Sequence, residues 1–150
     1  MSVGTYAGAE EAMVDLWVEA QIVAQAEALD AINPGLSGRI FSVVAPQGTP
    51  YPFIVYQCQS PPRDVRGVGV YRVMIDPLYV VKVVAQVMSY DPLAPVARVL
   101  DIALTSASGS AVADGRILAS VRNAGFHMVE IEAGTQYRHL GGEYRIQAQS

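Results

Sequence analysis

Few side chains in this sequence could do chemistry, and most of them lie near the C-terminus. His127 and His139 could in principle meet Glu130 or Glu132 around a metal ion. The two histidines lack a recognised ligand spacing and no CxxC pair accompanies them, so we expect them to serve as hydrogen-bonding residues. Glu130 and Glu132 lie two apart; paired carboxylates can act as acid and base, but this alternation is also typical of a half-exposed strand. We therefore predict no metal site and no catalytic pair.

Motifs for covalent or phosphate chemistry are missing as well. Cys58, the single cysteine, excludes an internal disulfide, has no signature of a nucleophile, and is interpreted as a small apolar residue in a strand. The run Arg66-Gly67-Val68-Gly69 lacks the third glycine and the following helix of a dinucleotide-binding loop. We expect no cofactor and no enzymatic activity.

The composition indicates a protein that shares apolar surface with a partner. Hydrophobic residues make up 51% of the 150 residues and charged residues only 16%, against roughly 25% charged in an ordinary soluble domain. One domain of this length cannot hide so much apolar surface alone, so we expect a sizeable subunit interface. The net charge of −4 argues against a protein that grips nucleic acid.

No targeting or membrane segment is expected. The first thirty residues carry acidic side chains but no Lys or Arg, which is the wrong charge for a signal peptide. Lys82 and Asp76-Pro77 interrupt the longest apolar runs, which fall short of the ~20 residues that span a bilayer. The sequence thus predicts a soluble, intracellular product that does not bind membranes.

The elements that must position these side chains begin with a helix. Residues 1–8 are expected to form a flexible arm, and residues 9–150 one α+β domain. From about Glu10 to Ala31 the apolar residues follow helical spacing, and the helix is predicted to stop at residues 33–35. The stripe comprises Met13, Leu16, Trp17, Ala20, Val23, Ala24 and Leu29. Trp17 is interpreted as an anchor in the core or at a subunit contact.

A Pro/Gly corner at residues 45–52 is predicted to organise the next elements. Two strands are predicted to meet across this stiff turn, at residues 39–44 and 53–56. The other elements should pack on that pair. The following segment, residues 60–69, carries Arg63, Arg66 and Val68 and is too rich in Pro and Gly for regular structure. It is either a floppy hairpin tip or an arm that binds a partner.

The strand predicted at residues 78–88 bears on assembly. Its odd-numbered residues are wholly apolar and must face the core. The even-numbered face carries Lys82 and Gln86 among four apolar residues, which is too apolar for solvent and too polar for a sealed core. We expect a helix or a neighbouring subunit to cover part of this face.

A second helix and three more strands complete the prediction. Asp91 is expected to cap a helix with Pro92 in its first position. An apolar stripe should pack this helix flat on a sheet; it comprises Leu93, Val96, Ala97, Leu100, Ala103 and Leu104. The last strands are predicted at residues 116–121, 126–132 and 143–148, the first two joined by a tight turn at residues 123–125. The fold class is α+β, with a mixed or antiparallel sheet of five to six strands packed by two helices.

A glycine-containing loop is predicted between the last two strands. Gly134, Gly141 and Gly142 would permit its bends. Tyr137, Arg138 and His139 combine aromatic and cationic groups of the kind enriched at interfaces, although an ordinary solvated loop would look the same.

Two stretches carry a resemblance to a known family. The string PQGTPYPFIVYQ at residues 46–57 and the run YRHLGGEYRI at residues 137–146 resemble the tail-terminator (tail completion) family of long-tailed bacteriophages. The resemblance extends from the first helix to the last strand. It implies an α+β subunit of a hexameric ring in the virion neck that caps the tail tube and stops tube polymerisation.

The same resemblance implies the partners. They are further copies of this chain, the major tail tube protein and the head–tail connector or stopper protein, while DNA passes through the ring lumen without specific binding. The family has no catalytic residues to transfer. Two other interpretations remain open. The protein could be another neck or tail component, such as a stopper or tube protein. It could also be a small cytosolic α+β enzyme or ligand-binding dimer, and such a protein would need a pocket of convergent polar groups.

Overall fold

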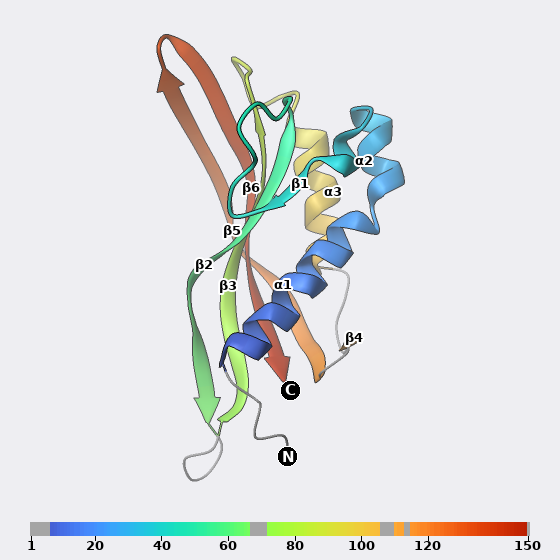
Figure 1. Cartoon of the computed structure of the whole chain (residues 1–150), viewed down its shortest axis with the longest axis vertical. Helices are drawn as coiled ribbons and strands as arrows, with labels where there is room; N and C mark the ends of the chain where they lie inside the picture. The colour runs from blue at the N-terminus through green and yellow to red at the C-terminus, as the bar shows by residue number, and fades with distance from the viewer. Residues whose placement is uncertain (1–6, 67–71, 106–109, 113–114, 150) are drawn as a thin grey trace.

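One mixed β-sheet with helices on one of its faces makes up the computed structural model, which describes residues 7–66, 72–105, 110–112 and 115–149 (Figure 1). The sheet order is β1-β2-β3-β6-β5-β4, with β1 and β2 parallel and the other neighbours antiparallel. The elements in chain order are α1 (Ala7–Val23), α2 (Ala26–Ile32), the 3-10 helix η1 (Leu36–Gly38), β1 (Ile40–Ser42), β2 (Phe53–Arg66), β3 (Arg72–Ala85), α3 (Ala94–Thr105), β4 (Ser110–Val112), β5 (Gly115–Glu132) and β6 (Thr135–Gln149). The expected α+β class, with a mixed or antiparallel sheet of five to six strands, is confirmed.

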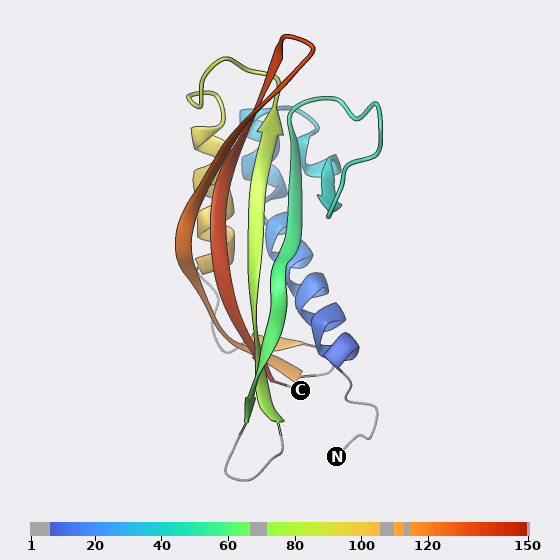
Figure 2. The ribbon, with the colours of Figure 1, turned by 90° about the vertical axis from the view of Figure 1, so that its left-hand side faces the viewer.

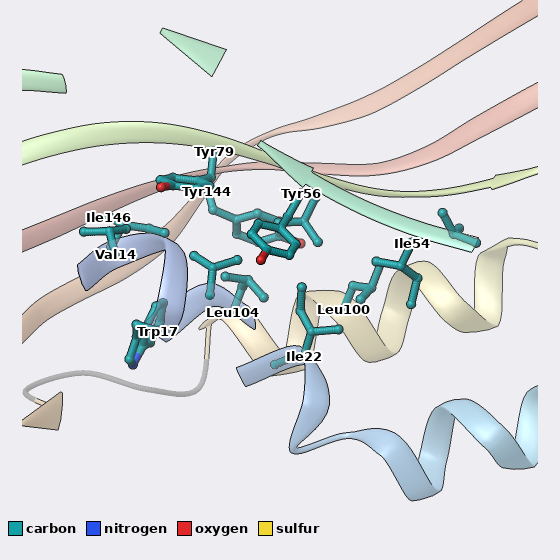
Figure 3. Close-up of a cluster of buried hydrophobic side chains, with 14 of the residues drawn as sticks. Val14, Trp17, Ile22, Ile54, Tyr56, Tyr79, Leu100, Leu104, Tyr144 and Ile146 are labelled. Carbon is teal, nitrogen blue, oxygen red and sulfur yellow. The ribbon is translucent and has the colours of Figure 1, made fainter. Parts of the chain in front are cut away.

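The core lies between the helices and one face of the sheet. Figure 3 shows Trp17, Ile22 and Leu104 from the helices close to the sheet side chains Tyr56, Tyr144 and Ile146. Two tyrosines of this face also bind helix carboxylates: Tyr79 donates a hydrogen bond to Asp15, and Tyr144 donates one to Asp101 at 2.9 Å. Burial raises the pKa of Tyr144, and its bond to Asp101 raises it further, so the phenol stays a donor. The predicted apolar face of residues 78–88 is confirmed as core.

The first helical segment differs from its prediction. Instead of one helix there are two, α1 and α2, separated at Ala24 and Gln25, so the described residues form three α-helices where two were predicted. The predicted stripe was wrong in part: Leu16 is 68% exposed and Val23 48% exposed. The buried face is formed instead by Met13, Val14, Trp17, Val18 and Ile22. Because α1 is apolar on several sides, more than one stripe fits helical spacing and only packing decides between them.

Two strands, β2 and β5, run through residues where the sequence predicted a loop or a turn. β2 continues through Pro61 and Pro62 to Arg66, where a loop was expected, and its pairing with β3 shifts register between Cys58 and Arg63. Such a shift lets prolines, which have no N–H to donate, lie within a strand. β5 likewise passes the predicted turn at residues 123–125 with a register shift between Arg122 and Ala124.

The predicted loop around Tyr137 was also wrong, because β6 runs unbroken from Thr135 to Gln149. The chain turns instead at Ala133 and Gly134, whose φ angles are 50° and 80°. Two adjacent left-handed residues fit the two-residue hairpin that follows the twist of its strands. Gly142 and Gly141 therefore lie inside a strand.

The remaining differences are at element ends. α3 begins at Ala94, three residues after the predicted cap Asp91, but its buried face of Val96, Leu100, Ala103 and Leu104 is confirmed. The strand predicted at 78–88 begins earlier, at Arg72, and ends at Ala85. Of the predicted arm at residues 1–8, residues 1–6 lie outside the described residues, and Ala7 and Gly8 begin α1.

Candidate interaction surface

The sheet face without helices carries a groove near the start of β2 and the end of β5. Figure 2 shows this face turned toward the viewer, with the helices behind it. The groove has a volume of about 260 Å³. We call it the sheet groove; it is lined by Val43, Val44, Ala45, Tyr51, Phe53, Val55, Lys82, Val84, Glu130, Glu132, Tyr137 and His139. The corner at residues 43–51 forms one wall, and β2, β3, β6 and β5 supply the rest.

Strand register brings the groove residues together. Val84 pairs with Phe53 on one side and His139 on the other, and Tyr137 pairs with Glu130. Directly paired residues point to the same face of a sheet. This face was expected to be covered by a helix or a neighbouring subunit. No helix in the described part of the chain lies on it (Figure 2), while Val80 and Val84 are nevertheless buried.

Aromatic rings form one side of the sheet groove. The Tyr51 ring lies 5.2 Å from the Phe53 ring and 5.5 Å from the Tyr137 ring, measured between centroids. Phe41 of β1 continues the row, with its ring 6.4 Å from that of Phe53. Burial raises the pKa of the Tyr51 hydroxyl, with Tyr137 and the two glutamates adding to the effect, so the phenol remains neutral at physiological pH.

Charged groups line the floor of the groove. The Nε2 atom of His139 lies 2.7 Å from Oε1 of Glu130, and the buried Nδ1 of the same ring has no hydrogen-bond partner among the described residues. Lys82 places its Nζ 5.2 Å from the centroid of the Phe126 ring. Burial lowers the pKa of Lys82, and the negative charge of Glu130 opposes that shift.

The pKa of His139 predicts that the stability of the fold depends on pH. Burial lowers the pKa of His139 below its usual 6.5, the cation of Lys82 lowers it further, and Glu130 opposes both. As the pH falls below 6.5, the unfolded chain binds a proton that the folded chain does not, so stability is lost down to the folded-state pKa. We predict that the free energy of unfolding in urea decreases between about pH 7.5 and about pH 5.5.

Two matched variants assign this effect. His139→Gln should flatten the pH dependence, because glutamine does not titrate. His127→Gln removes the exposed histidine of β5 and should leave the slope unchanged. An equal slope in wild type and His139→Gln would contradict the assignment.

β3 and β6 approach each other closely at Gly141, beside the groove residue Lys82. Gly141 pairs with Lys82 of β3 and with Phe126 of β5. A Cβ at position 141 would lie 2.0 Å from the backbone oxygen of Val81 and 2.6 Å from Cα of Lys82. Only glycine permits that approach. Gly141 thus lies between Lys82 and Phe126 in the strand register.

The corner wall of the groove is strained and apolar. Val43 has a φ of 67°, a left-handed value rare for a β-branched residue, and the N–H of Val44 donates to the carbonyl of Ser42 at 2.7 Å. The side chains of Val43, Val44 and Tyr51 are exposed. The corner does join two neighbouring strands, but β1 is a three-residue edge strand parallel to β2, so the expectation that all other elements pack on this pair was wrong.

The predicted contact residues separate into groups. Lys82, Tyr137 and His139 meet in the sheet groove. Arg138 pairs with Ala85 and so faces the helix side, where its guanidinium lies 4.8 Å from the Tyr90 ring centroid. Trp17, at 3% exposure, is a core residue.

The other predicted residues lie away from the groove. Gln86 is exposed just after β3. Arg63 and Arg66 belong to the far end of β2, and Val68 lies outside the described residues. Cys58 is in β2 as predicted, but exposed. An interface role for all nine predicted residues stays a prediction.

Sequence reasoning missed the aromatic and corner residues of the groove. Tyr51 and Phe53 were placed at a corner and a strand start without a functional role. Their spacing could have identified them. Tyr51 and Phe53 are two residues apart in an extended segment, with prolines on both sides of Tyr51, so both rings lie on the same face. Glu130 and Glu132 were considered as metal ligands, as an acid–base pair and as part of a half-exposed strand, but not as the lining of a groove. Across the described ranges, acidic, histidine and cysteine side chains form no group that could hold a metal ion.

Comparison with known proteins gives a likeness of fold. No protein-family model matches the sequence, and no curated protein matches it. Among solved structures, a chain of the virion of a native gene transfer agent (GTA) particle is similar, with a TM-score of 0.62 at 14% sequence identity. The likeness covers 88% of this chain and 94% of that chain. In the part of the chain that the structure describes, no helix has the length and apolar character needed to cross a bilayer. These comparisons place the chain in a fold also used within a virion.

Proposed function

We propose that this protein is a structural component of a virion and that a ring of six copies caps the finished tail tube of a long-tailed, phage-like particle. The observation that carries the first part is the fold likeness to a chain of the gene transfer agent virion, which extends over almost the whole of both chains. The tail-terminator resemblance of residues 46–57 and 137–146 supports the second part. The role is one of assembly rather than catalysis.

The surface of the subunit supports a role in assembly. The helix-free face combines the sheet groove with exposed apolar residues at the corner, and this pattern is typical of a surface that another protein covers. The sheet also ends in short edge strands, β1 and β4, of three residues each. Short edges limit uncontrolled strand addition, so specific side-chain contacts would direct assembly.

The proposed partners follow from the ring. One ring face would cover the last layer of the tail tube protein and stop its polymerisation, and the other would meet the head–tail connector or stopper. DNA would pass through the lumen. A subunit with a net charge of −4 suits that passage, because phosphate binding strengthens with each added Lys or Arg contact.

Tail length measures this function directly. We predict that particles made without this protein have tails of variable and excessive length that do not join heads, because nothing ends tube growth. Electron microscopy of negatively stained particles gives the length distribution, and a plasmid copy of the wild-type gene should restore the single normal length.

Other outcomes would identify a different component. Tails of normal length that fail to join heads would indicate a stopper or connector role, and a complete absence of tubes would indicate the tube protein itself. Either result would overturn the terminator proposal. Normal, infectious particles would exclude any essential role in the virion.

A further inference from the structure

The sheet groove combines aromatic rings with carboxylates. The ring of Tyr51, a residue that is 44% exposed, lies 5.5 Å from the ring of Tyr137, measured between centroids. Glu130 and Glu132 line the same groove and are exposed. Burial and the Tyr137 hydroxyl raise the pKa of Tyr51, and the negative charges of both glutamates raise it further, so the two carboxylates lie near this ring. Negative charge therefore gathers beside an exposed aromatic ring.

The groove does not balance this charge from its own side chains. Lys82 is the only Lys or Arg among the residues that line it, against two glutamates, and its Nζ lies over the Phe126 ring. His139 is held neutral by burial. Its Nε2–H donates to the carboxylate of Glu130, so Nδ1 is an acceptor to which no described residue donates. The groove thus has an excess of negative charge and of acceptors.

The size and the rim of the groove favour one side chain of a protein over a free metabolite. The volume of about 260 Å³ is below the roughly 300 to 1,000 Å³ typical of pockets for small molecules. Val43 and Val44 line the groove and are 62% and 72% exposed. A small cation would leave these valines in water. A protein segment would cover them while one of its side chains entered the groove, as an anchor residue does at an interface.

Arginine matches this lining better than lysine does. A guanidinium group is planar, stacks on aromatic faces and presents five N–H donors in a fork that fits carboxylates, whereas an ammonium group is a compact, strongly hydrated charge. A second copy of this chain is a poor source of that arginine. The chain has a net charge of −4, and its exposed Arg122 already lies 3.8 Å from Asp101 of the same subunit.

We propose that the sheet groove binds an arginine side chain of another protein of the virion. The guanidinium group stacks on the Tyr51 ring and pairs with the carboxylate of Glu132, and the partner's backbone covers Val43 and Val44. Complementary charge and the exposed apolar rim determine the fit. This inference rests on the proposed function and deepens it, by naming the group that the subunit recognises in a partner.

Blocked tripeptides test the groove in the purified full-length protein. Acetyl-Gly-Arg-Gly-amide is titrated into isotope-labelled protein, and the amide shifts in NMR spectra give the location and the affinity of binding. The shifts should be largest around Tyr51, Glu132 and Tyr137. The citrulline peptide keeps the shape of the side chain and loses its charge, so it should bind at least about tenfold more weakly. Added salt should weaken binding of the arginine peptide.

Single substitutions assign the contacts. Glu132→Gln keeps the size of the side chain and leaves the Glu130–His139 pair intact. It should weaken binding of the arginine peptide at least about threefold, since one exposed ion pair is lost. Tyr51→Leu should also weaken binding, whereas Tyr51→Phe keeps the ring and should bind like wild type. Glu27→Gln removes an exposed charge from α2 and is the control that should leave the affinity unchanged.

Compensating changes in particles identify the source of the arginine. Glu132→Arg brings like charges together, so the yield of complete particles should fall about tenfold or more. Second-site changes that restore the yield should remove an arginine from another virion protein. In sedimentation velocity, purified wild type and Glu132→Arg should self-associate equally, because the groove does not join copies of this chain.

The opposite outcomes overturn the inference without deciding the proposed function. Equal affinity for the arginine and citrulline peptides, or equal affinity of wild type and Glu132→Gln, would mean that the groove does not recognise guanidinium. Weaker self-association of Glu132→Arg, or restoring changes confined to this chain, would place a second copy in the groove. A normal yield of Glu132→Arg particles would mean that no virion protein docks there. The tail lengths of particles that lack the protein still test the proposed function.

Discussion

Gly141→Ala is expected to destabilise this protein strongly, although it adds a single methyl group. The added Cβ would lie 2.0 Å from the backbone oxygen of Val81 and 2.6 Å from Cα of Lys82. These are main-chain atoms of the neighbouring strand, so no side chain can rotate away, and β3 and β6 must separate. Overpacking of this kind costs about 3 kcal/mol or more of the free energy of unfolding.

Gly38→Ala is the matched control. A Cβ at position 38 would have no atom within 4 Å, and its backbone does not have a positive φ. Its effect on the free energy of unfolding should therefore be within about 0.5 kcal/mol, since surface changes away from special features are usually that small. If Gly141→Ala unfolds at the same urea concentration as Gly38→Ala, the close approach of the two strands is wrong.

Sequence pattern predicted those elements whose apolar and polar sides are distinct. α3 has one apolar face, and its buried residues Val96, Leu100 and Leu104 follow the predicted spacing. In β3, the alternation of Tyr79, Val81 and Val83 with less apolar residues fixed which side faces the core. In both elements a shift of one residue would expose the apolar set, so the pattern permits one solution.

The same reasoning failed where several solutions fit. In α1, Leu16 and Val23 satisfied helical spacing as well as Val14 and Val18 did, and only contact with the sheet selects the second pair. The prolines at 61 and 62 and the glycines at 141 and 142 were also predicted to interrupt regular structure, and no strand was predicted through them. Long strands can pass through such residues when the ladder resumes beyond them, as it does at Arg63.

The candidate site was predicted in part because its residues come from four strands. Lys82, Tyr137 and His139 were each chosen for residue type, but their meeting depends on the pairing of β3 with β6, which no single segment specifies. Adjacent Arg138 was chosen with them and lies on the other face, since its neighbours belong to a strand and not to the expected loop. In a strand, successive side chains point to opposite faces, so predicting β6 as a strand would have separated Arg138 from Tyr137 and His139.

Leu100→Ala is expected to have the second large effect, since Leu100 is fully buried between α3 and the sheet. The substitution removes three carbons from the core and leaves a cavity that the surrounding strands fill only in part. Comparable changes cost about 2 to 5 kcal/mol of the free energy of unfolding. A domain of this class is stabilised by only about 5 to 15 kcal/mol, so a lowered melting temperature and partly insoluble expression should accompany the loss.

Ile102→Ala, two residues along the same helix, separates packing from helix propensity. Ile102 is 52% exposed, and the substitution removes the same number of carbons from the same helix. Alanine is the better helix former, so this variant should be unchanged or more stable by a few tenths of a kcal/mol. Urea unfolding of the two variants at one pH gives the comparison. Equal destabilisation would mean that α3 does not pack on the sheet through Leu100, and near-neutral results for both would mean that the helix contributes little to the core.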